Sequence, residues 1–180
     1  VVGFRIYWAP FLGDSLQLWK EFNDVNVTSA VFNDEDSLGT IAGCFWVAAM
    51  DSLMPGPNGE LRRNQSLGGD TVCVDNCPFY FLPNVFSPNA DDENDLFRPF
   101  PWKFVDSVHV VIHNRWGEAV FETNNPDVLW EGTYLDTDER LPDGVYFYTV
   151  VVFTRRLEGI VSERFSGELH MISGEAGTTD

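Results

Sequence analysis

The chain has 180 residues, with 28 Asp and Glu against 11 Lys and Arg, so its formal net charge is −17. This charge argues against a nucleic-acid binder, because phosphate contacts need clustered cations, and it disfavours docking to anionic lipid head groups. Hydrophobic residues make up 44% of the chain and aromatic residues 14%, which is too apolar for a disordered acidic tail. No apolar run approaches the ~20 residues of a membrane-spanning helix. We therefore expect one large or two small folded domains.

The first half of the chain shows short strand patterns. Residues 1–8 (VVGFRIYW) alternate like a strand already under way and lack an initiator Met, so we expect a fragment of a longer protein. Residues 16–20 are a candidate second strand. Residues 44–51 (CFWVAAMD) predict a strong strand, and residues 71–74 (TVCV) predict its antiparallel partner.

The second half continues this pattern, and helical periodicity is almost absent. Turns are predicted at residues 114–117 (NRWG) and 142–144 (PDG). The predicted strands are residues 79–86, 104–113, 118–122, 145–153 and 160–171. Many short strands with a turn about every ten residues indicate an all-β protein. We predict two immunoglobulin-like or fibronectin-like antiparallel β-sandwich modules in tandem.

The boundary between the modules is predicted at residues 75–78 (DNCP), where a proline and turn residues follow the last strand of the first half. The first module then spans residues 1–78 and is incomplete at its N-terminus. The second module spans residues 79–172. Residues 173–180 are small and acidic, and we expect them to be disordered.

The chain has three cysteines, so one thiol stays unpaired if the other two form a disulfide. We expect Phe45, Val47 and Ala49 to face the core, which puts Cys44 on the outer face of its strand. If Asp51 and Asp70 lie opposite each other, the register places Cys44 opposite Cys77. We therefore predict a Cys44–Cys77 disulfide, with Cys73 as the alternative partner. A zinc site is not predicted, since residues 73–77 lack a second ligand pair and a nearby His.

The acidic loop at residues 89–95 (NADDEND) allows two interpretations. Asn89, Asp91, Glu93 and Asp95 alternate along the chain, as the oxygen ligands of calcium often do. The alternative is a turn rich in Asn and Asp whose side chains accept hydrogen bonds from backbone N–H groups. The loop lacks the Gly and Glu of an EF-hand loop, so the turn is favoured, calcium remains a weak candidate, and no metal site is predicted.

No catalytic constellation is recognisable, and we predict that the chain is not an enzyme and needs no cofactor. Ser107 and His109 supply letters of a hydrolase triad, but no Gly-x-Ser-x-Gly elbow is present. His109 and His113 lie about 13 Å apart on a strand at ~3.3 Å per residue, too far to share a metal ion. Phosphate-binding glycine loops and dinucleotide fingerprints are also absent.

Six Trp residues raise the alternative of a carbohydrate- or surface-binding adhesin module, because aromatic faces bind sugars. Trp46 is expected to face outward and Trp19 is a candidate for exposure. Trp116 is expected to pack at the edge of the core, with Arg115 paired to a nearby acid. Trp130 is expected to be a core anchor, the commoner role of Trp.

Four motifs in the second module resemble a known family. Residues 81–97 (FLPNVFSPNADDENDLF) resemble the signature LPNVFTPNGDGxNDxF, with Ala90 and Asp92 where that signature has glycine. Residues 113–122 (HNRWGEAVFE), 130–133 (WEGT) and 142–148 (PDGVYFY) resemble its later motifs. The module therefore resembles the gliding-motility-associated C-terminal domain, also called the type B sorting domain of the type IX secretion system. The first module resembles the fibronectin type III-like domain that often precedes it.

The resemblance implies a non-catalytic C-terminal secretion signal and cell-surface anchor of a larger passenger protein. Family members belong to Bacteroidota-type bacteria, pass through the periplasm and are secreted or held at the outer cell surface, commonly as the tails of adhesins. The implied partners are the type IX translocon, a PorP/SprF-like outer-membrane barrel and upstream passenger domains of the same chain, with no nucleic acid. The contact candidates lie in the opening segment and the last strand: Phe81, Leu82, Pro83, Asn84, Val85, Phe86, Phe165, Glu168, Leu169 and Met171.

Overall fold

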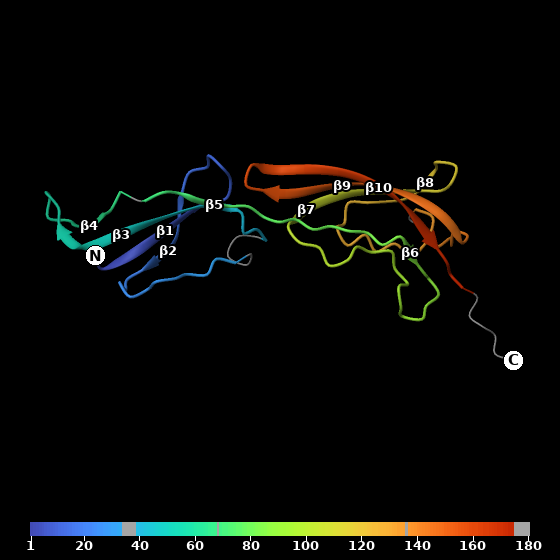
Figure 1. Cartoon of the computed structure of the whole chain (residues 1–180), viewed down its shortest axis with the longest axis horizontal. Coiled ribbons are helices and arrows are strands. Elements are labelled where there is room, and N and C mark those ends of the chain that lie inside the picture. Colours follow the sequence, from blue (N-terminus) through green and yellow to red (C-terminus); the bar gives the residue numbers. More distant parts are fainter. Residues whose placement is uncertain (34–38, 68, 136, 175–180) are drawn as a thin grey trace. The chain divides into compact units, whose positions relative to one another are not determined.

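A computed structural model describes residues 1–33, 39–67, 69–135 and 137–174 (Figure 1). Within these ranges the chain is all-β and contains no helix, which confirms the predicted fold class. The described residues thus offer no helix able to span a membrane. The last six residues of the predicted disordered tail lie outside the described residues. The strands are β1 (Gly3–Ala9), β2 (Gln17–Phe22), β3 (Gly43–Pro55), β4 (Leu61–Gln65), β5 (Val72–Val74), β6 (Val85–Phe86), β7 (Val105–His113), β8 (Ala119–Thr123), β9 (Gly144–Arg156) and β10 (Gly159–Met171).

The chain divides into two compact units, which are described separately below. The first unit holds Val1–Asn76 together with Arg155–Gly159, which comprises the end of β9, the turn after it and the first residue of β10. The second unit holds Cys77–Thr154 and the chain from Ile160 onward.

The first unit is built on one sheet in the order β2-β1-β3-β4, with β5 also paired to β3. Its buried face carries Cys44, Ala48 and Met50 of β3, whereas Val47 on the opposite face is 50% exposed. The expectation that Phe45, Val47 and Ala49 face the core is therefore wrong for Val47, whereas Phe45 packs edge-on against Phe32 with ring centroids 4.9 Å apart. Ala48 and Met50 are buried because long polar side chains cover their face of the sheet. Arg5 lies opposite Ala48, and the Arg63 guanidinium lies 3.9 Å from the Met50 sulfur.

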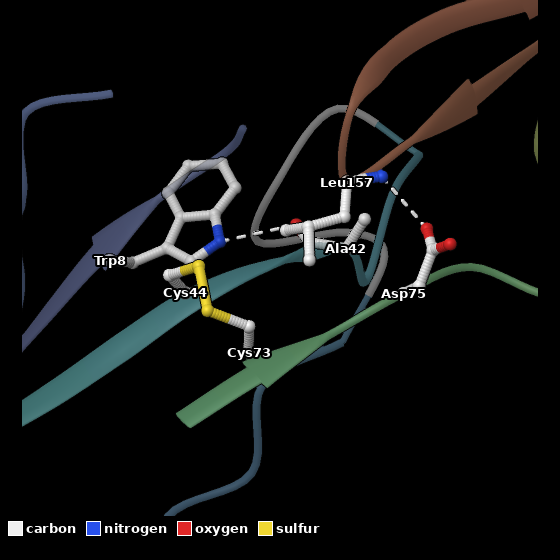
Figure 2. Close-up of a disulfide and its surroundings, with 6 residues drawn as sticks. All are labelled: Trp8, Ala42, Cys44, Cys73, Asp75 and Leu157. Atoms are coloured by element: carbon white, nitrogen blue, oxygen red, sulfur yellow. Dashed lines mark hydrogen bonds between the residues drawn. A yellow bond between two sulfur atoms is a disulfide. The ribbon is translucent and has the colours of Figure 1, made fainter. Parts of the chain in front are cut away.

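The disulfide joins Cys44 to Cys73, the alternative partner, so the preferred Cys44–Cys77 pair is wrong. Cys44 lies directly opposite Cys73 in the β3–β5 ladder, with 4.0 Å between their Cα atoms, and Cys77 is a free, exposed thiol. Figure 2 shows the bond bridging β3 and β5 beside Trp8, whose indole N–H donates to the Ala42 carbonyl at 3.3 Å. In the same unit, the Leu157 N–H donates to the Asp75 carboxylate at 2.8 Å (Figure 2).

The second unit is built on one sheet in the order β6-β10-β9-β7-β8, where β6 runs parallel to β10. Short antiparallel bridges outside the sheet tie irregular segments together, for example Phe97 with Trp130. The sheet and these segments enclose one continuous apolar core. Its buried members are Leu82, Phe86, Phe97, Val108, Val110, Ile112, Val120, Val128, Trp130, Tyr146, Val150, Val152, Leu169 and Met171.

Candidate functional site

The motifs of the second unit meet in its core. Phe86, Phe97 and Trp130 come from three separate segments, and their ring centroids lie 5.4–6.5 Å apart. Tyr146 packs edge-on against Trp130 at 5.7 Å. The indole N–H of Trp130 donates to the Thr133 carbonyl at 2.8 Å, which satisfies the polar atom that burial would otherwise isolate. The expectation that Trp130 anchors the core is confirmed by its exposure of 1%.

Gly132 shows why the third motif contains glycine. Its φ is +79°, a left-handed conformation that favours glycine, and a Cβ at this position would lie 2.6 Å from the Met171 sulfur. The motif therefore lets β10 approach the Trp130 segment closely. A bulkier residue would push the last strand away from the core.

The structure brings together the two segments predicted to contact a partner. Val85 lies opposite His170 in the parallel β6–β10 ladder, and the His170 N–H donates to the Asn84 carbonyl at 2.8 Å. The sequence did not predict this pairing, because β6 has only two residues and so short a strand shows no alternating pattern.

The ten predicted contact residues divide into two groups. Leu82, Phe86, Leu169 and Met171 are buried in the core and have no surface to present. The exposed or partly exposed group consists of Phe81, Pro83, Asn84, Val85, Phe165 and Glu168.

Two neighbouring hollows lie beside β6. The larger has a volume of about 900 Å³ and the smaller about 600 Å³. Both are lined by Pro83, Val85, Phe86, Asn94 and Phe100. At the smaller hollow the Phe81 ring packs against Phe100 with centroids 5.6 Å apart. The opening segment therefore forms a partly apolar, concave surface next to the end of the sheet.

The acidic loop is held by its own side chains. One oxygen of the Asp95 carboxylate accepts the N–H groups of Asn89 and Ala90, at 2.9 and 2.6 Å, and the other accepts that of Asp92 at 2.8 Å. Asp91 accepts from the Asn89 side chain and from the Glu93 N–H, and these bonds lower the pKa of Asp91. Carboxylates that accept backbone N–H groups within the loop are what the turn interpretation predicted.

Within the described ranges, no group of three or more His, Cys, Asp or Glu side chains is arranged to hold a metal ion. The φ angles of Ala90 and Asp92 are +62° and +69°. Both residues therefore adopt the left-handed conformation that the related signature supplies with glycine.

The predicted turn at residues 114–117 is present between β7 and β8. The Gly117 N–H donates to the Asn114 carbonyl at 3.0 Å. Two expectations for this turn are wrong. Trp116 is 75% exposed and does not pack on the core. Arg115 stacks on the Trp116 ring at 4.3 Å, and the structure shows it no acid partner in the part of the chain described.

The His and Ser candidates on β7 are not brought into a catalytic arrangement. Nδ1 of His109 lies 3.1 Å from the Asn124 side-chain oxygen, and Nε2 lies 3.8 Å from the Glu122 carboxylate. Both of these neighbours belong to the exposed surface. The geometry thus supports no nucleophile–base pair at Ser107.

Comparison with family models matches residues 80–164 to the CHU_C type IX secretion signal domain. No curated protein and no solved structure matches the chain. The match lies within the second unit except at the β9–β10 turn, and leaves the first unit's resemblance to fibronectin type III-like domains a prediction.

Proposed function

Because residues 80–164 form a type IX secretion signal domain of the CHU_C family, we propose that the chain exports a larger passenger protein and retains it at the outer cell surface. The observation that carries this proposal is the family match, whose motifs supply the rings of one core: Phe86, Phe97, Trp130 and Tyr146. A signal of this kind is a folded shape rather than an unfolded tail. We infer no catalytic role for it.

The proposed route passes through the periplasm before the type IX translocon. The proposed partner for export or surface retention is a PorP/SprF-like outer-membrane barrel. The proposed domains are the predicted modules, a fibronectin type III-like module at residues 1–78 and the sorting module at 79–172. An acidic chain with a disulfide in its first unit is compatible with this route and with an exposed surface.

The proposed contact surface is the sheet edge where the last strand extends beyond β6. The His170 N–H points toward β6, and N–H groups two residues apart on a strand point the same way, so the Glu168 N–H points to the same side. β6 pairs only with His170 and Met171, so it does not cover Glu168. A strand of the partner can add at such an edge, its main chain giving affinity and alternate side chains giving specificity.

The export test uses the full chain fused behind a neutral soluble reporter with a signal peptide, in a bacterium with a type IX system. The expected result is protease-accessible reporter on whole cells, and periplasmic reporter in a strain without the translocon. A wild-type fusion trapped in the periplasm, while the host's own substrates reach the surface, would refute the proposal.

Glu168→Pro tests the strand-edge contact. The substitution removes an outward N–H donor, which an edge strand tolerates, and should abolish export without unfolding the module. Glu168→Ala is the matched control, because it alters the side chain but keeps the N–H group. Equal export of the two variants would remove the edge from the mechanism.

The alternative function is a carbohydrate- or surface-binding adhesin module. The observation that favours it is the exposed indole of Trp116. A glycan array probed with the purified chain distinguishes this function from sorting, since sorting requires no glycan binding.

A further inference from the structure

Trp116 is the most exposed Trp in the described part of the chain. Its side chain is 75% exposed at the turn between β7 and β8. Four other Trp residues donate their indole N–H within the protein: Trp8, Trp46, Trp102 and Trp130. The Trp116 indole N–H has no acceptor among the residues that the structure describes. The Trp116 ring and its N–H group are therefore both accessible to a second molecule, which can use the apolar body and the polar handle together.

The turn that carries Trp116 is rigidly held. The Asn114 side-chain oxygen accepts the N–H groups of Trp116 and Glu118, both at 3.0 Å. The Asn114 amide donates to the Glu118 carboxylate at 2.9 Å, and the Tyr134 hydroxyl lies 3.2 Å from the same carboxylate. These bonds fix the backbone beneath the exposed ring. A binding group held in this way loses little conformational entropy when it docks.

Arg115 completes the exposed group. Its guanidinium carbon lies 4.3 Å from the Trp116 ring centroid, which is a cation–π arrangement. Within the described part of the chain no carboxylate pairs with it. Arg115 and Trp116 therefore present an apolar surface together with hydrogen-bond donors and a positive charge, on a chain whose net charge is −17.

We propose that Arg115 and Trp116 are the anchor by which this module docks on a protein component of the export machinery. The partner's chemistry follows from the anchor: an apolar slot that takes the indole, with a carboxylate beside it that accepts from the guanidinium and the indole N–H. Trp and Arg are the residue types most enriched among binding hot spots. The guanidinium covers one face of the indole, which leaves less flat surface for a sugar ring. This proposal rests on the proposed secretion function.

The test measures protease-accessible reporter on whole cells for full-chain fusions that carry Trp116→Ala or Arg115→Ala. We expect Trp116→Ala to lower surface reporter by at least ~10-fold, the loss typical of a hot spot, and Arg115→Ala by less. Ile160→Ala is the control, because it also truncates an exposed apolar side chain (48% exposed), at the other end of the sheet. Thermal unfolding of the purified variants should match that of the wild type.

The outcomes separate the anchor from the wider function. Surface export of the wild type with equal export of Trp116→Ala overturns the anchor and leaves the secretion function standing. Failure of the wild-type fusion itself refutes the secretion function. Specific glycan binding that Trp116→Ala abolishes, with export unchanged, overturns the protein anchor in favour of a sugar site.

Discussion

In the first unit the buried apolar side chains are small except for Met50, whereas those of the second include Trp130, Phe97 and Phe86. The buried apolar residues of the first unit, among those described, are Ala9, Ala42, Cys44, Ala48 and Met50. Burial of apolar area stabilises a fold by about 25 cal/mol per Å², so small side chains contribute little. The first unit needs other sources of stability.

One disulfide, polar pairs and partly buried aromatic contacts around Phe32 supply these sources in the first unit. The Cys44–Cys73 bond closes a segment with a sequence separation of 29 residues. Glu21 accepts from Arg5 at 2.7 Å and from Arg63 at 3.1 Å. The comparison teaches that two all-β units in one chain can depend on different interactions. They should then respond differently to core truncation, reduction and acid.

The largest effect is expected for Trp130→Ala in the second unit. Removing a fully buried Trp ring should lower the free energy of unfolding by about 3–5 kcal/mol. The measurement is urea denaturation of the full chain, followed by circular dichroism. Trp116→Ala is the matched control and should change stability by less than ~0.5 kcal/mol, because its ring is exposed. Similar losses for both variants would contradict the assignment of Trp130 to the core and Trp116 to the surface.

Reduction should affect the first unit selectively. Loss of the Cys44–Cys73 bond should lower the stability of that unit by about 3–4 kcal/mol, the chain-entropy value for a loop of this length. The measurement is urea denaturation with and without a reductant. Cys77→Ser should behave like the wild type in both conditions. Peptide mapping that finds Cys77 bridged, rather than free, would argue against the observed pairing.

The sequence predicted the strands well where apolar and polar residues alternate, as in β7 and β9. It also predicted the turn at residues 114–117, whereas at residues 142–144 the structure has only a bend at Asp143 before β9. β4 was missed because its sequence, LRRNQ, is too polar to show a strand pattern. β4 pairs with the second half of β3 and leaves β5 to pair with the first. The predicted register ignored this division, which explains why the cysteine partner was Cys73 rather than Cys77.

The sequence predicted the identity of the candidate site and the burial of Trp130, but it did not predict the exposure of Trp116. The motifs marked Phe86, Trp130 and Trp116 as important, yet a motif does not say whether a ring points inward. Trp130 precedes a glycine that allows close packing, whereas Trp116 lies within a tight turn whose ends are strands. A ring at the tip of a short turn has little protein around it. That geometric argument was available from the spacing alone and would have indicated exposure.

Ala90→Gly should stabilise the second unit without affecting the first. The φ of Ala90 is +62°, and relief of this left-handed conformation should raise stability by about 1 kcal/mol. Ala119→Gly is the control: it lies within β8, where glycine should lower stability by about 0.5–1 kcal/mol. Thermal unfolding of the two variants should therefore shift in opposite directions. A loss of stability in both would show that the loop does not carry the expected strain.

The smallest effect concerns acid. Hydrogen bonds and charge from Arg5 lower the pKa of Glu21 below its ordinary value of 4.5, and Ser173 likewise lowers the pKa of Asp143. A carboxyl whose folded pKa is depressed adds stability above its unfolded pKa, and this stability is lost as the pH falls through the folded value.

Glu21→Gln should therefore flatten the acid side of the pH profile of stability for the first unit alone, and Asp143→Asn should flatten that of the second unit alone. The measurement is urea denaturation between neutral pH and pH about 3. Because Glu21 is only partly buried and Asp143 is exposed, the slopes should also weaken in high salt. If Glu21→Gln changed the profile of the second unit instead, the Arg5–Glu21–Arg63 cluster would not be a source of stability particular to the first.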